Sequence, residues 1–369
     1  MHIQRILFLS LTLSIGLGFC ACTVSDYTLV TGSYTDQTDA KGLNVYRLNA
    51  KTLDAQLFSQ TRVDNPSYFT FSPDGSKLYV ASENDTNSYV SAYTFDENVY
   101  RLSPLGAPVK VRDNPCYIAI HPVNPILVTA NYSSASISFM RLSSQTGELM
   151  TVYSTCYFGG HGKDSVRQEA PHPHCVTFTP DGIQLFATDL GKDAIYSFVD
   201  PSDIPEVIAV GDTTPGTLPQ GPRHLIFTKD SQRAYLINEL SGNVMLFNQQ
   251  DGKLTLVQTV EADSLHAGGS ADIRLSPDEQ FLYVSNRLQG DGIVSFKVNK
   301  ADGTLSRLAF TPTEKHPRNF RITPDGKLVL VACKDGNCIQ ILKRDKKTGM
   351  LTDTGKKIVI DSPVCVVVR

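Results

Sequence analysis

The sequence predicts an all-β fold, a seven-bladed β-propeller built from four-stranded blades. A hairpin pattern recurs along the whole chain, two further strand-like runs separate consecutive hairpins, and helical periodicity is nearly absent. Four short strands in each repeat of about 48 residues are typical of a propeller blade. A composition of 41% hydrophobic and 19% charged residues, with a net charge of -3, is that of a globular protein with a sizeable core.

Six hairpins carry the repeat. Each consists of an apolar strand, a turn resembling Ser/Thr/His-Pro-Asp-Gly, and a second apolar strand. They begin at Ser67 (SYFTFSPDGSKLYVASE), Cys116 (CYIAIHPVNPILVTANY), His174 (HCVTFTPDGIQLFATDL), Arg223 (RHLIFTKDSQRAYLINE), Ala271 (ADIRLSPDEQFLYVSNR) and Arg318 (RNFRITPDGKLVLVACK). Their even spacing predicts stacked copies of one unit. One longer interval marks an insertion within Phe158–Pro173, which we expect to be an irregular and functional loop at one face.

The two ends of the repeat region supply the seventh blade. Ser362–Arg369 reads as a first strand after which the sequence stops, and Tyr27–Tyr34 reads as a second strand without a first. We expect these segments to pair and close the ring. Residues 27–369 are therefore predicted to form one domain.

The N-terminal segment Met1–Cys22 is predicted to be a signal peptide. Arg5 precedes an apolar run, Ile6–Phe19, that is too short to span a bilayer comfortably, and Phe19–Cys22 resembles a lipobox. We expect an exported bacterial lipoprotein in the cell envelope, periplasmic or at the outer membrane, that contacts the membrane only through acylated Cys22. An ordinary secreted protein is the alternative.

The cysteines, the metal-ligand spacings and the basic residues limit which cofactors and partners the protein is expected to have. The six later cysteines permit disulfides in an exported protein, but several lie inside strand-like runs, where buried free thiols are expected. CxxC pairs and zinc-type Cys/His spacings do not occur, so we expect no metal and no cofactor. Basic runs are absent apart from Lys343–Lys347, which argues against a nucleic-acid partner. We expect a monomer.

Candidate site residues lie at the open ends of the hairpins. The turn closes one end of an antiparallel hairpin, so the first and last residues are neighbours; in Gly221–Leu240 these are Arg223, His224, Asn238 and Glu239. Equivalent positions diverge between the copies while the flanking apolar residues stay alike. The first position holds Ser67, Cys116, His174, Arg223, Ala271 and Arg318, the second Tyr68, Tyr117, Cys175, His224, Asp272 and Asn319, and the exit Glu83, Tyr132, Leu190, Glu239, Arg287 and Lys334. Such divergence predicts a binding site at one mouth of the channel.

The residue types at this mouth indicate the chemistry. Arg223, Arg287 and Arg318 predict an anionic ligand bearing a carboxylate or a phosphate, and His224 and Asn319 complete the predicted substrate-binding set. His174 and Glu239 are the predicted catalytic acid/base pair. Any one of these residues alone could instead form an ordinary rim salt bridge.

The six hairpins, with motifs such as PHPHCV, GPRH, LINEL and YVSNR, resemble the lactonase family over essentially all of 27–369. That family includes the propeller-type 6-phosphogluconolactonases and the fungal carboxy-muconate lactonizing enzymes. In the lactonizing members a His and a Glu are the proposed acid/base residues and arginines bind carboxylates, and these roles fall on His174, Glu239, Arg223 and Arg287. Many relatives read Pro-Arg-His-Phe where this chain has Pro317–Phe320, which weakens any role assigned there.

The resemblance implies a metal-independent hydrolysis of a sugar lactone to its acid. Water activated by Glu239 or His174 would attack the carbonyl, Arg223 would polarise the oxyanion, and Arg287 and Arg318 would hold the anionic group of the substrate. Which residue is the base stays open. Two alternatives also stay open: a muconate-type lactonizing cycloisomerase, and a non-catalytic envelope propeller that binds a ligand or a protein. The predicted export argues against cytoplasmic 6-phosphogluconolactone as the substrate.

Overall fold

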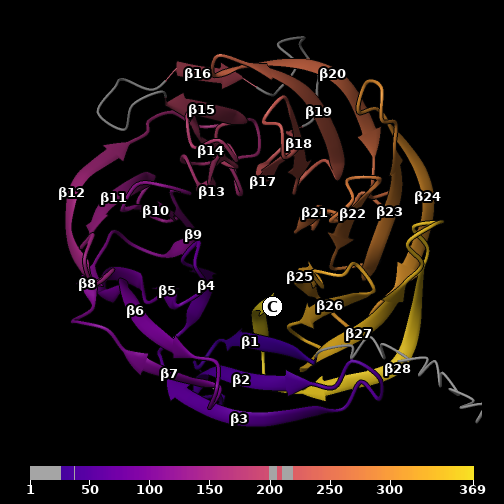
Figure 1. Cartoon of the computed structure of the whole chain (residues 1–369). Coiled ribbons are helices and arrows are strands. Elements are labelled where there is room, and N and C mark those ends of the chain that lie inside the picture. The colour runs from indigo at the N-terminus through magenta and orange to yellow at the C-terminus, as the bar shows by residue number, and fades with distance from the viewer. Residues whose placement is uncertain (1–25, 37, 199–205, 210–218) are drawn as a thin grey trace, which may run out of the picture.

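The computed structural model describes residues 26–36, 38–198, 206–209 and 219–369, and the predicted signal peptide lies outside these ranges. In the described part, seven antiparallel sheets radiate around a central channel, which confirms the predicted seven-bladed propeller (Figure 1). The described residues include one short 3-10 helix, Asp85–Asn87. None of their helices has the length and apolar character needed to cross a membrane.

The first strand of each predicted hairpin is the innermost strand of its blade (Figure 1). These strands are β29 (Pro363–Val368), β4 (Pro66–Phe71), β9 (Pro115–Ile120), β13 (Pro173–Phe178), β17 (Pro222–Phe227), β21 (Ile273–Leu275) and β25 (Pro317–Ile322). All of them run through the channel wall in the same sense, so their first residues share one mouth and their last residues share the other.

The second and third strands form the buried middle of each blade. The second strands are β1 (Tyr27–Ser33), β5 (Lys77–Ser82), β10 (Ile126–Asn131), β14 (Leu185–Asp189), β18 (Arg233–Asn238), β22 (Phe281–Asn286) and β26 (Leu328–Cys333). The third strands are β2 (Gly42–Leu48), β6 (Tyr89–Asp96), β11 (Ser136–Leu142), β15 (Ala194–Phe198), β19 (Asn243–Gln250), β23 (Gly292–Val298) and β27 (Cys338–Arg344). Neighbouring blades cover both faces of these strands, which is why they read as continuous apolar runs.

The outer strands pack on the core through one face only, as the mixture of exposed and less exposed residues along β20 and β24 shows. They are β3 (Ala55–Arg62), β7 (Arg101–Pro104) with β8 (Val109–Lys110), β12 (Leu149–Tyr157), β16 (Glu206–Ala209), β20 (Lys253–Glu261), β24 (Leu305–Pro312) and β28 (Leu351–Val359).

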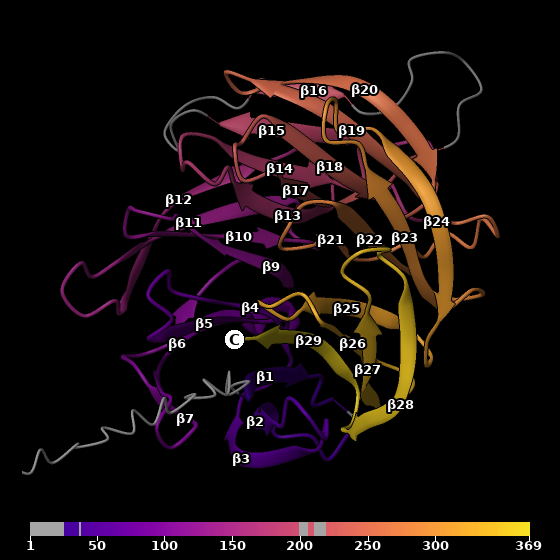
Figure 2. The ribbon, with the colours of Figure 1, turned by 45° about the vertical axis from the view of Figure 1, so that its right-hand side comes forward.

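The two ends of the described chain close the ring. β29 pairs antiparallel with β1, with Val366 opposite Thr31, and the backbones of Thr28 and Arg369 exchange two hydrogen bonds. Figure 2 shows β29 beside β1. The predicted composite blade is therefore confirmed, and it joins residues more than 300 positions apart in one sheet.

All six described cysteines are free thiols. Five are buried and Cys156 is half-buried, as expected for thiols in packed strands. Cys333 and Cys338 lie directly opposite each other on β26 and β27.

Candidate active site

A β-bulge opens the innermost strand in six of the seven blades. The register shifts there leave one extra residue on that strand: Ser67, Cys116, His174, Arg223, Arg318 and Val364. A proline precedes each of them and has no N–H for the ladder, so strand pairing is already interrupted at this point. A bulge re-aims the side chain of its extra residue. All of the diverging first positions except Ala271 are thus bulge residues, and they gather at one mouth of the channel.

The centre of this mouth is Glu239, which directly follows β18. Its Oε2 accepts from Nε of Arg223 at 2.7 Å and lies 3.1 Å from Nη2 of Arg287, while its Oε1 accepts from Nη2 of Arg167 at 2.7 Å. Arg223 and Arg287 are almost fully buried, at 2% and 6% exposure. One carboxylate thus meets three guanidinium groups.

This clamp fixes the charge of the site. Burial raises the pKa of Glu239, but the charges of Arg287, Arg223 and Arg167 outweigh it and lower that pKa to about 2. Burial lowers the pKa of Arg287 to about 9, and the nearby guanidiniums work in the same direction. The carboxylate is therefore ionised at neutral pH and cannot balance its three partners, so the mouth favours an anion.

Arg167 was not predicted as a site residue, although the sequence placed it in the insertion expected to be functional. The loop positions it locally, because Oδ1 of Asp164 accepts from the backbone N–H groups of Val166 and Arg167. Gln168 is fully buried and ties the loop to the turn between β14 and β15. Its side-chain amide donates to the carbonyl of Leu190 and to Asp193, at 2.8 Å each. An arginine inside the one long insertion was the only sequence signal for this residue.

Gly191 packs closely against the backbone of the same loop. A Cβ added there would collide with the carbonyl oxygen of Ala170. We expect Gly191→Ala to destabilise the protein by about 1–3 kcal/mol, because backbone must shift to make room. Thermal or urea denaturation measures this, and Gly159→Ala is the matched control, since a Cβ at Gly159 meets nothing within 4 Å. Equal stability of the two variants would contradict the close packing of this loop.

The imidazole of His224 contacts the guanidinium of Arg223 and positions it. Nη1 of Arg223 lies 3.1 Å from Nε2 of His224, and Nδ1 of His224 lies 2.8 Å from Oδ1 of Asp272, which assigns the proton to Nδ1. Burial and the charge of Arg223 outweigh Asp272 and lower the pKa of His224 to about 3, so the ring is neutral. Nη1 of Arg223 also donates to the carbonyl of Ala271 at 2.6 Å.

Asn319 belongs to the same buried layer. Its Nδ2 donates to Asp272 at 2.7 Å, and its Oδ1 accepts from the backbone N–H of Val366 at 3.0 Å. Both ring nitrogens of His224 and both amide atoms of Asn319 therefore bond to protein. These contacts position Asp272 and Arg223, and the predicted substrate-binding role of His224 and Asn319 stays a prediction.

His174 lies at the same mouth and is buried. Its Nδ1 is 3.8 Å from Sγ of Cys116, and its ring meets those of His224 and Tyr132 edge-on at 5.5 and 5.6 Å. Burial, with the charge of Arg223 next in size, lowers its pKa well below the usual value, so the imidazole is neutral. Within the described residues no hydrogen bond joins His174 to Glu239, and Nε2 of His174 has no hydrogen-bond partner.

Two further residues at the open ends of the hairpins, Arg318 and Asn238, also bond to other protein groups. Arg318 lies on the far side of the mouth, where its Nη2 donates to the hydroxyl of Tyr34 at 3.0 Å, and Tyr34 donates to Glu83 at 2.6 Å. Asn238, the last residue of β18, donates to the carbonyl of Asn243 within its own blade. The described side chains form no cluster of three or more His, Cys, Asp or Glu suited to a metal ion.

Comparisons with known proteins agree with this fold. The model of a family described as "Lactonase, 7-bladed beta-propeller" matches residues 28–368. A 6-phosphogluconolactonase of Formosa agariphila is 33% identical, and the match covers 90% of this chain and 97% of that protein. A Bacteroides fragilis structure provisionally named a 6-phosphogluconolactonase is 41% identical with a TM-score of 0.87, covering 95% of this chain and 99% of that one. A periplasmic gluconolactonase of Pseudomonas aeruginosa is 31% identical with a TM-score of 0.82, covering 93% and 99%. The chain therefore belongs to the lactonase family of seven-bladed β-propellers.

Proposed function

We propose that this protein hydrolyses a sugar lactone to the open-chain sugar acid at the arginine-rich mouth. The observation that carries the proposal is the clamp on Glu239, where Arg167, Arg223 and Arg287 outnumber the single carboxylate. Hydrolysis of an ester places negative charge on the carbonyl oxygen in the transition state. Guanidinium groups held in a buried site stabilise such a charge without having to reorganise.

The proposed reaction uses the neutral imidazole of His174 as the base. Water loses a proton to His174 as its oxygen attacks the lactone carbonyl, and Arg223 stabilises the oxyanion. As the intermediate collapses, the ring C–O bond breaks and protonated His174 returns its proton to the leaving ring oxygen, which becomes a hydroxyl. The new carboxylic acid loses its proton to water and leaves as a carboxylate. Both carboxylate oxygens of Glu239 already accept from arginines, whereas Nε2 of His174 has no hydrogen-bond partner within the described residues, so Glu239 orients the guanidiniums instead. An anionic substrate offsets the charge of Arg223, which raises the pKa of His174 towards neutrality and improves it as a base.

The charge of the mouth supports an anionic sugar lactone as the substrate. Three guanidiniums against one carboxylate leave two positive charges, which suit a phosphate or carboxylate group held by Arg287 and Arg167. The relatives include a protein named for the phosphorylated lactone and one named a periplasmic gluconolactonase. The second name is consistent with our proposal that this chain is exported and acts on a non-cytoplasmic lactone. We propose in addition that the chain is a monomeric lipoprotein anchored through Cys22, on the lipobox-like Phe19–Cys22 alone.

A panel of lactones tests the function. Acid release from 6-phosphogluconolactone and from δ-gluconolactone is followed in a pH-stat, with spontaneous hydrolysis subtracted. We expect turnover of both, with kcat/KM at least about tenfold higher for the phosphorylated lactone, since one added charge contact of 1.4 kcal/mol gives that factor. Glu239→Gln and His174→Ala are each expected to lower kcat/KM by about 100-fold or more.

The matched controls are Glu97→Gln and His266→Ala, whose side chains are 73% and 68% exposed. Both are expected to keep the activity of the unaltered protein. Unchanged hydrolysis in Glu239→Gln and His174→Ala would remove the proposed site, and tight lactone binding without any turnover would show a binding protein instead of an enzyme.

A further inference from the structure

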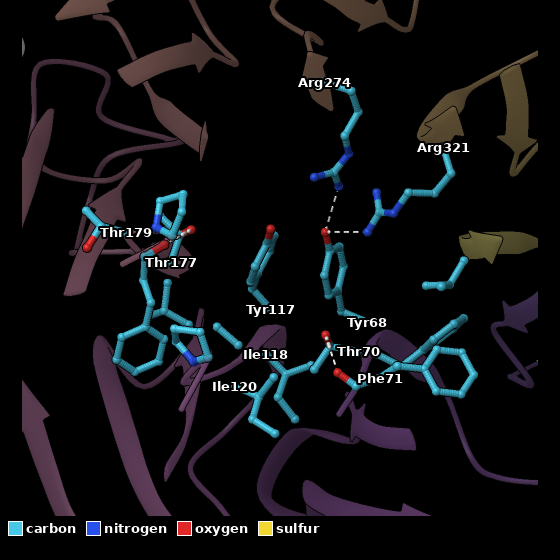
Figure 3. A pocket seen from close by; sticks show the side chains of 17 residues that line it. Tyr68, Thr70, Phe71, Tyr117, Ile118, Ile120, Thr177, Thr179, Arg274 and Arg321 are labelled. Carbon is cyan, nitrogen blue, oxygen red and sulfur yellow. Dashed lines mark hydrogen bonds between the residues drawn. The ribbon is translucent and has the colours of Figure 1, made fainter. Parts of the chain in front are cut away.

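The opposite mouth of the channel contains a second cavity of about 450 Å³. It lies where β4, β9 and β13 end, and it is closed on the other side by Arg274 of β21 and Arg321 of β25 (Figure 3). The candidate active site lies where these strands begin. The two sites therefore occupy opposite ends of the channel.

An aromatic layer separates the cavity from the arginine-rich mouth. Tyr68 and Tyr117 stack with their ring centroids 4.0 Å apart, and the ring of His224 meets Tyr117 edge-on at 5.0 Å. Each of these residues directly follows a bulge residue of the first mouth. A ligand in the cavity thus meets the lower face of this layer and does not reach Glu239.

The cationic wall of the cavity carries unbalanced charge. Nη2 of Arg274 and Nη2 of Arg321 both donate to the hydroxyl of Tyr68, at 2.8 and 3.1 Å, as Figure 3 shows. Asp272 is the carboxylate that both contact, at 3.0 Å from Arg274 and 3.4 Å from Arg321. Since His224 is neutral, two guanidiniums face one negative charge.

Arg274 is also incompletely bonded. Its Nε is buried and has no hydrogen-bond partner within the described part of the chain. Leaving a charged group's N–H unpaired in the protein interior is unfavourable. An anion that accepts hydrogen bonds from the accessible N–H groups of this wall relieves the excess charge.

The facing wall is mainly apolar, because the hydroxyls of its threonines, Thr70, Thr177 and Thr179, already donate to other protein groups. Phe71, Ile120 and Phe178 line it, together with the stacked ring of Tyr117. Such a wall gives an inorganic ion nothing to replace its hydration shell, but it offers contact area to a flat hydrocarbon group.

We propose that this cavity binds a small organic carboxylate with a planar apolar body. The carboxylate pairs with Arg274 and Arg321, whose fork geometry suits it, and the apolar body packs against Phe71 and Phe178. One negative charge matches the single excess positive charge of the wall. This site is separate from the lactone site and does not depend on the proposed hydrolysis.

Benzoate is the probe for the test, with isothermal titration calorimetry on the full-length protein as the measurement. We expect a Kd of about 1 mM or tighter. Benzamide, which has the same shape without the charge, and inorganic phosphate, which has charge without the apolar body, are each expected to bind at least about tenfold more weakly. Arg321→Gln is expected to weaken benzoate binding by a similar factor.

Two further variants make the result specific. Ala119 lines the cavity, so Ala119→Phe fills it without touching the charged wall; it should abolish benzoate binding and leave lactone turnover unchanged. Arg307→Gln, on the exposed face of β24, is the matched control for Arg321→Gln. Benzoate binding that survives both Arg321→Gln and Ala119→Phe overturns the proposal, because the anion then binds elsewhere. Phosphate binding as tight as that of benzoate also overturns it, because the apolar wall then contributes nothing.

Discussion

Replacing Asp272 by asparagine is expected to destabilise the propeller by about 3–5 kcal/mol, the range for breaking a buried ion pair. The side chain is fully buried and bonds to His224, Arg274, Asn319 and Arg321, and to the backbone N–H groups of residues 273 and 320. The amide has the same shape but no charge, so two guanidiniums lose their common counter-ion. This loss is a large fraction of the 5–15 kcal/mol that typically stabilises a folded protein.

Urea denaturation at pH 7 measures the effect, and Asp302→Asn in an exposed turn is the matched control, with an expected change within about 0.5 kcal/mol. The double variant Asp272→Asn/Arg321→Gln tests the cause. Removing one guanidinium lessens the excess charge, so the double variant should be more stable than the sum of the single losses by about 0.5–3 kcal/mol. Strict additivity would show that the charge balance is not what Asp272 supplies.

The fold was predictable because the same hairpin pattern occurs in six copies along the sequence. A single hairpin such as Gly221–Leu240 is ambiguous, but six copies with aligned turns leave a propeller as the simple solution. The closing blade was predictable for a related reason. Ser362–Arg369 and Tyr27–Tyr34 each matched one half of the repeat, and the pairing of β29 with β1 unites those halves.

The location of the site was predictable, but the direction of its side chains was not. Comparison of the copies identified Arg223, Glu239 and Arg287, which the structure joins in one cluster. The bulge at the start of the inner strand adds one residue, and alternation along a strand then no longer tells which of Arg223 and His224 faces the mouth. For that reason the sequence did not show that His224 and Asn319 bond to Asp272.

The contacts of Arg167 and Asp272 depend on tertiary structure that the sequence pattern does not encode. Arg167 comes from an insertion without periodicity, so its bond to Glu239 follows from how Gln168 fastens the loop. Asp272 did appear among the second positions of the repeat. Its role as a shared counter-ion follows only from the folded structure, in which side chains from β17, from β25 and from its own blade meet around it. These side chains are His224, Arg274, Asn319 and Arg321.

Lowering the pH from 7 to 5 is expected to destabilise the protein before Glu239 and Asp272, whose pKa values are lowered, begin to protonate. Burial lowers the pKa of His224 to about 3, that of His174 well below its usual value and that of His316 to about 4, with Arg223 or Arg287 adding to each shift. The unfolded chain takes up these protons near pH 6.5, whereas the folded protein does not. The unfolded state therefore binds more protons below pH 6.5, and stability falls as the pH falls.

The slope is about 1.4 kcal/mol per pH unit for each histidine, which gives about 2 kcal/mol for each by pH 5. Glu239 adds a second phase: its folded pKa of about 2 lies below its ordinary value of 4.5, so its contribution is complete above pH 4.5 and is lost as the pH falls towards 2. Urea titrations between pH 7.5 and 2 measure both phases. His224→Gln should remove about one third of the slope above pH 5, while His266→Gln, at an exposed position, should leave it unchanged. A stability that stays constant between pH 7 and 5 would mean that these histidines protonate in the folded protein, and neutral His174 would then no longer be available as the base.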